Sequence, residues 1–179
     1  MDLPAFRYHG YFVRPASGSE SEALSRFFHE AGDETDFLSF SGCDCPYTPG
    51  VCEDFIAACE QQGNLLLLAF DDEVLIGELS FTAPHRKRFS HTRELGIALR
   101  KAYCDKGLGT AMLKTALKWA DENDVDSISL TVSKENARGL HLYEKLGFSV
   151  YGVYPRQSFY NGVYHDTVYM VRFRQETAF

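Results

Sequence analysis

Two short segments of the sequence contain residue types that could bind a ligand or catalyse a reaction. The first, residues 100–111, has glycines at 107 and 109 immediately before an amphipathic stretch. Glycine allows close approach of backbone amides, and the first amides of a helix have no partner within it, so this turn favours a phosphate. Lys106 adds a positive charge. An ordinary strand-to-helix turn stays the alternative, because the pattern is neither a Walker loop nor a dinucleotide fingerprint.

The second segment, residues 132–148, combines an asparagine, a tyrosine and a glycine on one helical face. These residues are Asn136, Tyr143 and Gly147, with Leu140 between them. Taken alone, the segment favours a structural interpretation. Asn136 would cap the helix, and Tyr143 would pack in the core with its hydroxyl at the rim.

The elements that must position these segments follow from hydrophobic periodicity and from glycine and proline positions. A strand over 91–100 and a helix over 107–123 flank the glycine turn, and a strand over 127–132 precedes a helix over 136–146. Further strands are predicted at 8–14, 64–70, 74–82, 148–154 and 163–172. Helices are predicted at 17–31 and 53–62, and loops at 33–52, 84–90 and 155–162. This order predicts one α+β domain over residues 1–179, in which an antiparallel meander leads into βαβ crossovers.

Composition excludes several classes of protein. The chain has 179 residues, of which 14% are aromatic, more than a disordered chain carries. Its longest apolar run is residues 65–70, too short to span a membrane. The first residues lack the basic flank and apolar core of a signal peptide. We therefore expect a cytoplasmic protein without a membrane partner.

The charge of the chain, −7 in total, is unevenly placed. Residues 1–60 contain 11 acidic and 3 basic side chains, whereas the remainder is nearly neutral. Nucleic acid is not expected as a partner, because binding phosphates requires a concentrated basic face. The acidic region indicates a cationic partner, with a merely solvated surface as the alternative.

The five cysteines form an odd set in a chain that lacks a signal peptide: Cys43, Cys45, Cys52, Cys59 and Cys104. A disulfide framework is therefore not expected. Their spacing also differs from the paired knuckles of zinc fingers and ribbons. We expect reduced thiols and no metal.

Together, the two segments resemble the GNAT superfamily of acetyl-CoA-dependent N-acetyltransferases. The resemblance rests on Gly-x-Gly before a helix, an alternating strand, and then Asn136-Ala137, Tyr143-Glu144-Lys145 and Gly147-Phe148. It extends to the strand over 91–100 and to Tyr164-x-Asp166-x-Val168-x-Met170. It covers residues 64–173 well and residues 8–60 only by element order.

The resemblance implies a fold with a mixed, mostly antiparallel sheet of about seven strands flanked by four helices. The fourth and fifth strands, here 91–100 and 127–132, would splay to hold the pantetheine arm of acetyl-CoA. The acceptor-side helices would lie at about 17–62, the acetyl-CoA-binding core at about 64–150 and the closing strands at about 147–173. Many members of the superfamily dimerise, so a homodimer stays open.

The resemblance also implies cofactor-binding residues. Backbone groups of Ile97, Ala98 and Leu99 would line the pantetheine arm. Asn136 would bind the cofactor or a bridging water. The amides of one continuous turn would hold the pyrophosphate: Asp105, Lys106, Gly107, Leu108, Gly109 and Thr110. The family usually has arginine or glutamine three residues before the first glycine, where this chain has Cys104; Lys101, Lys106 or Arg138 could compensate.

In the implied reaction, an amine attacks the acetyl thioester directly. Tyr143 matches the family's general-acid tyrosine. Glu94 is the candidate base, with Glu78 and His91 in reserve. The structural alternative for Glu94 is an ion pair with Arg93 or Lys101. An acetyl-cysteine mechanism through Cys104 is the competing chemistry, and the basic turn Arg86-Lys87-Arg88 is either a contact for the cofactor's 3′-phosphate or a solvated hairpin tip.

The acceptor follows from the acidic region, which the resemblance places around the acceptor site. A small-molecule or peptide amine is expected, such as a polyamine, an aminoglycoside or a protein N-terminus. Its charge would be met by carboxylates and its walls would be aromatic: Asp33, Glu34, Asp36, Asp44, Glu53, Asp54, Phe37, Phe40, Tyr47, Phe159 and Tyr160. The alternatives are a non-catalytic acetyl-CoA-binding sensor and a structural protein without a cofactor.

Overall fold

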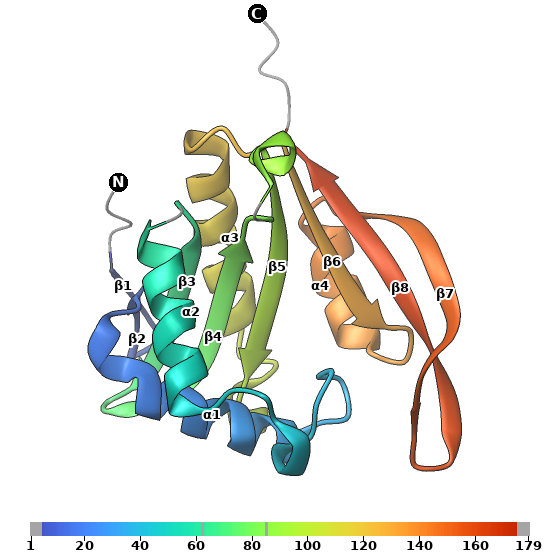
Figure 1. Ribbon diagram of the computed structural model, residues 1–179, viewed down its shortest axis with the longest axis horizontal. Helices are drawn as coiled ribbons and strands as arrows, with labels where there is room; N and C mark the ends of the chain where they lie inside the picture. The colour runs from blue at the N-terminus through green and yellow to red at the C-terminus, as the bar shows by residue number, and fades with distance from the viewer. Residues whose placement is uncertain (1–4, 62, 85, 175–179) are drawn as a thin grey trace, which may run out of the picture.

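The apolar run at 65–70 becomes β3 (Leu65–Asp71), an inner strand of an eight-stranded sheet (Figure 1). The computed structural model describes residues 5–61, 63–84 and 86–174. The other strands are β1 (Phe6–Tyr8), β2 (Tyr11–Pro15), β4 (Val74–Thr82), β5 (Thr92–Leu99), β6 (Ser127–Ser133), β7 (Ser149–Tyr160) and β8 (Val163–Phe173). Their spatial order is β1-β2-β3-β4-β5-β6-β8-β7, and only the β5–β6 pair is parallel.

Within the described residues, four α-helices lie on the two faces of this sheet, as expected. They are α1 (Ser21–Glu34), α2 (Pro49–Gln61), α3 (Leu108–Glu122) and α4 (Ala137–Lys145). In Figure 1, α1 and α2 lie in front of the sheet and α3 and α4 lie behind it. No helix lies in front of β6, β7 and β8 in this view.

Four predicted boundaries were wrong. The helix predicted at 17–31 continues as α1 to Glu34, and Gly32 is buried within it instead of ending it. The strand at 8–14 is the hairpin β1–β2, because His9 and Gly10 adopt positive φ values of 49° and 95°. This hairpin accounts for the eighth strand. The predicted 33–52 loop ends early because α2 begins at Pro49, whose fixed φ suits a first helical position; the predicted end at residue 62 lies outside the described residues. The 155–162 loop is mostly strand, since β7 continues to a two-residue turn at Asn161 and Gly162.

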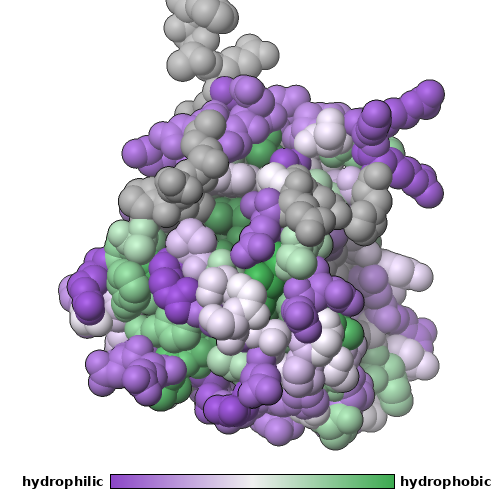
Figure 2. Space-filling view, turned by 60° about the vertical axis from the view of Figure 1, so that its left-hand side comes forward, coloured by the Kyte–Doolittle hydropathy of each residue, from purple (hydrophilic) through white to green (hydrophobic). Residues whose placement is uncertain are grey.

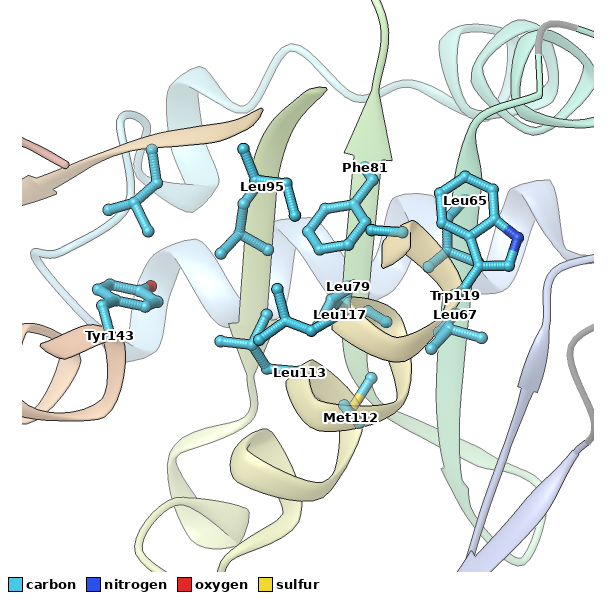
Figure 3. Packing of buried hydrophobic residues seen from close by; sticks show 14 of the residues in the cluster. Leu65, Leu67, Leu79, Phe81, Leu95, Met112, Leu113, Leu117, Trp119 and Tyr143 are labelled. Carbon is cyan, nitrogen blue, oxygen red and sulfur yellow. The ribbon is translucent and has the colours of Figure 1, made fainter. Parts of the chain in front are cut away.

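Successive side chains of each strand point to opposite faces of the sheet, which divides the core into two layers. Leu65, Leu67 and Ala69 pack toward α3, and Leu66, Leu68 and Phe70 pack toward α1 and α2. Figure 3 shows the first layer, where the side chains of α3 meet those of β3 and β4. This packing fixes β4 and β5 between two apolar layers and so fixes the edge of β5 that faces β6.

The expected splay lies between β5 and β6. Their parallel pairing consists of Thr92 with Ser127, Arg93 with Ile128, and Glu94 with Ser129. Beyond this last pair, β5 continues to Leu99 along β4 alone. The backbone of residues 95–99 therefore has no strand partner on its β6 side.

Candidate active site

The turn between β5 and α3 has the geometry of an anion-binding site. Asp105 and Gly107 have left-handed φ values of 60° and 82°. Gly107 is the N-cap of α3, and among the described residues no side chain caps this end. The first-turn amides, those of Leu108, Gly109 and Thr110, therefore lack intrahelical partners, and successive amides in such a turn form a concavity that suits an anion.

The charged side chains around this turn are already engaged. Arg138 donates to Asp105 at 2.7 Å, and the Lys106 ammonium lies 5.2 Å from the centre of the Tyr103 ring. Backbone amides therefore have to provide most of the interaction with a phosphate. The turn fits a pyrophosphate through its amides, with Lys106 and Arg138 exposed at its rim.

Cys104 is poorly suited to act as a nucleophile. Its thiol is partly buried and donates to the Arg100 carbonyl, with a sulfur–oxygen distance of 3.7 Å. Burial raises the pKa of this thiol, so less thiolate forms at neutral pH. The acetyl-cysteine mechanism therefore finds no support in the geometry.

The residues expected to line the pantetheine arm lie along the unpaired edge of β5. Ile97 and Leu99 face α3, where a Cβ at Gly109 would lie 3.3 Å from Leu99. Ala98 faces the α1 and α2 side and pairs with Glu78 of β4. The backbone amides and carbonyls of β5 that point away from β4, toward β6, have no strand partner there. They can therefore hydrogen-bond the amide groups of an inserted chain.

Tyr143 combines the structural and the chemical interpretations. Its ring is 8% exposed and packs edge-on against Phe148, with 5.9 Å between ring centroids. The hydroxyl is directed from α4 toward the side of Leu95 on β5 (Figure 3). Burial raises the pKa of this phenol to about 12, so it stays protonated at neutral pH and can donate a proton.

Asn136 acts as a helix cap. Its side-chain oxygen accepts a hydrogen bond from the Gly139 amide at 2.9 Å. The capping interpretation is therefore correct, and the side-chain NH₂ group and one lone pair of the oxygen are left for a cofactor or water.

Glu94 lies at the last paired position before the splay, opposite Ser129. It is exposed, and no ion pair with Arg93 or Lys101 is found within the described chain. Arg93 instead donates to three backbone carbonyls, those of Ser90, Thr92 and Gly63. The alternative of a salt-bridged strand end is thus not supported.

Glu78 differs sharply from Glu94 although both side chains lie on the α1 and α2 side of the sheet. It is 3% exposed, and its Oε1 atom has no hydrogen-bond partner among the described residues. Burial raises the pKa of this carboxyl group to about 7, against the opposing hydrogen bond from Ser80.

The third candidate, His91, precedes β5 at the end opposite to the glycine turn, as does the basic turn Arg86-Lys87-Arg88. That position favours the hairpin-tip interpretation of the basic turn.

A polar sheet face beside Glu94 was missed at the sequence level. Along β6, Ile128, Leu130 and Val132 are buried in the α3 layer, so the intervening residues face the opposite side. These residues of β6 are all polar: Ser129, Thr131 and Ser133. Their cross-strand neighbours on β8 are Val171, Tyr169 and Thr167, so the hydroxyl row runs along β6 and the neighbouring strand is mixed. The alternating apolar pattern of residues 127–133 was a usable signal, because its complement is all serine and threonine.

Half of the acidic residues assigned to the acceptor wall have structural partners. Glu34 accepts hydrogen bonds from Arg100 and from the Lys101 amide. Asp33 accepts from the Gly42 amide, and Asp44 from Ser41. The described ion pairs and side-chain hydrogen bonds do not include Asp36, Glu53 and Asp54. Of these carboxylates only Glu34 is paired with a cation, whereas neutral donors hold Asp33 and Asp44 in place and leave their charge intact.

The predicted aromatic wall is also divided. Phe40 and Tyr47 pack together over Phe28, with centroid distances of 6.1 and 4.1 Å to that ring. They belong to the core beneath the α1–α2 loop. Phe159 is 61% exposed, and Tyr160 stacks on His165. These two lie at the tip of the β7–β8 hairpin.

Neither a metal site nor a membrane-spanning helix is found in the described ranges. There, no three histidine, cysteine or acidic side chains converge as a metal site would require. None of the helices in those ranges has the length and apolar character needed to cross a bilayer.

Comparison with known proteins places these features in a family. Residues 26–148 match the family described as acetyltransferase (GNAT) family. An L-amino acid N-acetyltransferase of Escherichia coli K12 is 31% identical over 114 residues, which cover 63% of this chain and 70% of that protein. A spermidine N(1)-acetyltransferase of the same organism is 34% identical over 84 residues, 46% of this chain and 45% of that protein. A putative acetyltransferase from Salmonella typhimurium, solved with acetyl-CoA, superposes with a TM-score of 0.83 at 21% identity, covering 96% and 98% of the chains.

Proposed function

The chain belongs to the GNAT acetyltransferase family and is an acyltransferase that uses acetyl-CoA; we propose that it acetylates the primary amine of a small acceptor that carries a second positive charge. The observation that carries this proposal is a juxtaposition. The amides of the glycine turn, the unpaired edge of β5 and the Tyr143 hydroxyl lie around one gap between β5 and β6. Exposed Glu94 opens onto the polar face of the same gap.

The chain's residues would bind acetyl-CoA from its phosphates inward. The amides of residues 105–110 would hold the pyrophosphate, and backbone groups of Ile97, Ala98 and Leu99 would hydrogen-bond the pantetheine amides. Acetyl-CoA supplies the thioester carbonyl that the amine attacks. Each contact uses backbone groups, so it depends on the fold of the turn and of β5 rather than on a charged side chain at position 104.

Proton transfer would use two groups. The acceptor arrives as an ammonium ion and must lose a proton before its nitrogen can form a bond to carbon. Glu94 would accept this proton, directly or through one water, because its exposed carboxylate is in reach of an acceptor on the polar face. The nitrogen, now bonded to the carbonyl carbon, carries one more proton than the amide product. The carbon–sulfur bond then breaks, the Tyr143 hydroxyl would donate its proton to the departing thiolate, and the proton that the nitrogen loses would restore the Tyr143 hydroxyl.

The substitution Tyr143→Phe tests the enzyme against the sensor alternative. It removes one hydroxyl and keeps the buried ring, so the fold and the binding of acetyl-CoA should persist. A general acid contributes about 10²-fold or more to a rate. We therefore expect thiol release from acetyl-CoA with a diamine acceptor to fall by about that factor.

The thermal unfolding midpoint measured with and without millimolar acetyl-CoA supplies the control. Ligand at about 100 times its Kd adds about 2.7 kcal/mol of stability, so both proteins should show a rise of several degrees. A rise without turnover in the wild type, over a panel of amines and amino acids, would establish the sensor instead. Equal turnover by wild type and Tyr143→Phe would remove Tyr143 from the mechanism.

A further inference from the structure

The ring of Tyr103, which precedes the glycine turn, is fixed from two sides. Its hydroxyl donates a hydrogen bond to the Asp71 carboxylate at 2.8 Å, and its ring forms a T-shaped pair with that of Tyr11, with 5.4 Å between the centroids. Asp71 ends β3, and Tyr11 begins β2. Since β3 and β5 both run antiparallel to β4, the end of β3 lies at the same end of the sheet as the end of β5 (Figure 1). Two strands therefore hold the Tyr103 ring beside the turn.

The face of this ring holds the ammonium group of Lys106. The Nζ atom lies 5.2 Å from the ring centre, within the distance of about 6 Å over which an aromatic face attracts a cation. The ring carries no net charge, so the contact leaves the positive charge of Lys106 intact, and the residue is exposed. A lysine side chain loses rotamer entropy when it binds a ligand. Because the ring already restricts the Lys106 side chain, less of that entropy is left to lose.

The backbone of the turn is held by the same part of the fold. In the β1–β2 hairpin, Tyr8 pairs with Tyr11, and the Tyr8 hydroxyl lies where a Cβ at Gly107 would collide with it. One hairpin thus supports the Tyr103 ring through Tyr11 and the N-cap of α3 through Tyr8. The Lys106 ammonium and the first amides of α3 are therefore held in one arrangement.

The other cations around the turn are less suited to meet a phosphate. Arg138 is paired with the Asp105 carboxylate at 2.7 Å, which offsets its charge. The hydrogen bond described for Lys101 is donated by its backbone amide, and within the described chain no ion pair or ring contact holds its ammonium group. Lys106 also forms none of the described ion pairs, but the Tyr103 ring fixes its position. The fold therefore presents the charge of Lys106 to this turn.

We propose that the Lys106 ammonium binds a phosphate group of acetyl-CoA and that Tyr103 is the residue that positions it. This inference rests on the proposed placement of the cofactor phosphates at the glycine turn. It adds a side-chain contact to the backbone amides, at a turn where Cys104 supplies no charge. An ammonium ion has three N–H donors, so it can donate to a phosphate oxygen while the ring face attracts it from another side.

Acetyl-CoA offers this chemistry at two places, the pyrophosphate and the 3′-phosphate of its ribose. A comparison of CoA with 3′-dephospho-CoA separates them, because only CoA carries the 3′-phosphate. A loss of affinity for both ligands in a Lys106 variant would place the ammonium at the pyrophosphate. A loss for CoA alone would place it at the 3′-phosphate.

The first variant is Lys106→Gln, which removes the charge and keeps most of the side-chain length. We expect its Kd for CoA, measured by isothermal titration, to rise about fivefold, which is the size that an exposed charge pair can give. The difference from the wild type should shrink as the salt concentration is raised, because salt screens exposed charges. Lys118→Gln removes the same charge from an exposed position on α3 and is the matched control, for which we expect an unchanged Kd.

The second variant, Tyr103→Leu, tests the positioning role. Without the ring the Lys106 ammonium samples more conformations, so we expect the Kd for CoA to rise about threefold. Tyr103→Phe keeps the ring face and should retain most of the affinity. The double variant Tyr103→Leu/Lys106→Gln should bind CoA no more weakly than Lys106→Gln alone, because the ring acts through the ammonium.

Several results would overturn the inference. An unchanged Kd for both ligands in Lys106→Gln, or an equal rise in Lys118→Gln, removes the Lys106 ammonium from the site. Additive effects of Tyr103→Leu and Lys106→Gln, or a loss of affinity in Tyr103→Leu that persists at high salt, show that Tyr103 only supports the fold. If the wild type binds neither ligand, the proposed function fails first. Unfolding midpoints measured without ligand show whether each variant is folded.

Discussion

Glu78 carries a carboxyl group inside the layer between the sheet and α2. Its neighbours include Leu68 and Ala98 across the adjacent strands, and its charge also contributes to raising the pKa of the Cys52 and Cys59 thiols of α2. The carboxyl oxygen without a partner makes the ionised form costly there. The protonation state of Glu78 therefore affects how stably α2 packs on the sheet.

The pH dependence of stability should report this group. The folded-state pKa of about 7 lies above the reference value of 4.5, so the folded protein binds a proton more tightly than the unfolded chain. The stabilisation that comes from this proton is complete below about pH 4.5 and is lost as the pH rises through about 7. The free energy of unfolding should fall by roughly 3 kcal/mol over this range. Glu78→Gln removes this proton-binding group and should flatten the decline, measured by urea unfolding at pH 5 and pH 8.

Glu73→Gln is the control, because this exposed carboxylate lies outside the core. The variant should show the same dependence of the free energy of unfolding on pH as the wild type. A wild-type stability that does not fall between pH 5 and pH 8 would contradict the buried, proton-binding state of Glu78.

At the scale of elements, the strand β5, the glycine turn and the helix α3 act as one unit. The turn needs a positive φ at Gly107, and a Cβ there would collide with the hydroxyl of Tyr8 from β1. The amides that face the proposed pyrophosphate are therefore held in place by a backbone conformation that other residues rarely adopt.

The substitution Gly107→Ala should damage both stability and cofactor binding. A left-handed alanine costs about 1–2 kcal/mol, and the collision with Tyr8 adds to this cost. We expect a lower unfolding midpoint and the loss of most of the rise that acetyl-CoA produces.

Gly162→Ala is the matched control, because φ is 76° there and nothing lies within 4 Å of the added Cβ. It should lose stability but keep the full acetyl-CoA shift; equal shifts in both variants would exclude the turn as the phosphate site.

At the scale of the molecule, one cluster of charges joins the acceptor side to the cofactor side. Arg100, at the end of β5, is bound by Glu30 and Glu34 of α1. Glu34 also accepts the Lys101 amide at the start of the path to the glycine turn. Burial opposes the charge of Glu34, but these hydrogen bonds outweigh it and lower the pKa of its carboxyl group. The position of α1 is thereby tied to the turn.

Glu34→Gln tests this connection. The variant should lose about 1 kcal/mol of stability at pH 7, a figure reduced for the partial exposure of the pair. The pKa of Glu34 is lowered in the folded protein, so its contribution to stability is present at neutral pH and is lost on acidification. The free energies of unfolding of the wild type and of Glu34→Gln should therefore converge near pH 3. We also expect weaker acetyl-CoA binding by a few-fold in isothermal titration. Glu122→Gln, which breaks an exposed helix pair with Lys118, should change neither quantity measurably.

The sequence by itself determined the elements whose signals are local. The glycine turn, α3, α4 and the buried strand β3 could be predicted because helix caps, positive-φ glycines and apolar periodicity act within a few residues. The sequence also pointed to Tyr143 and to the family, since its motif is contiguous. The homodimer and the cytoplasmic location stay predictions.

Only the tertiary structure decided where the charges and polar faces act. Arg100 meets Glu34 across 66 positions of the chain. The burial of Glu78 also depends on α2, which is remote in sequence. Long-range pairing of this kind leaves no local periodicity, because a carboxylate on a strand has the same pattern whether a helix covers it or not. For that reason the acidic composition indicated a cationic acceptor, whereas only the fold shows which carboxylates have structural partners.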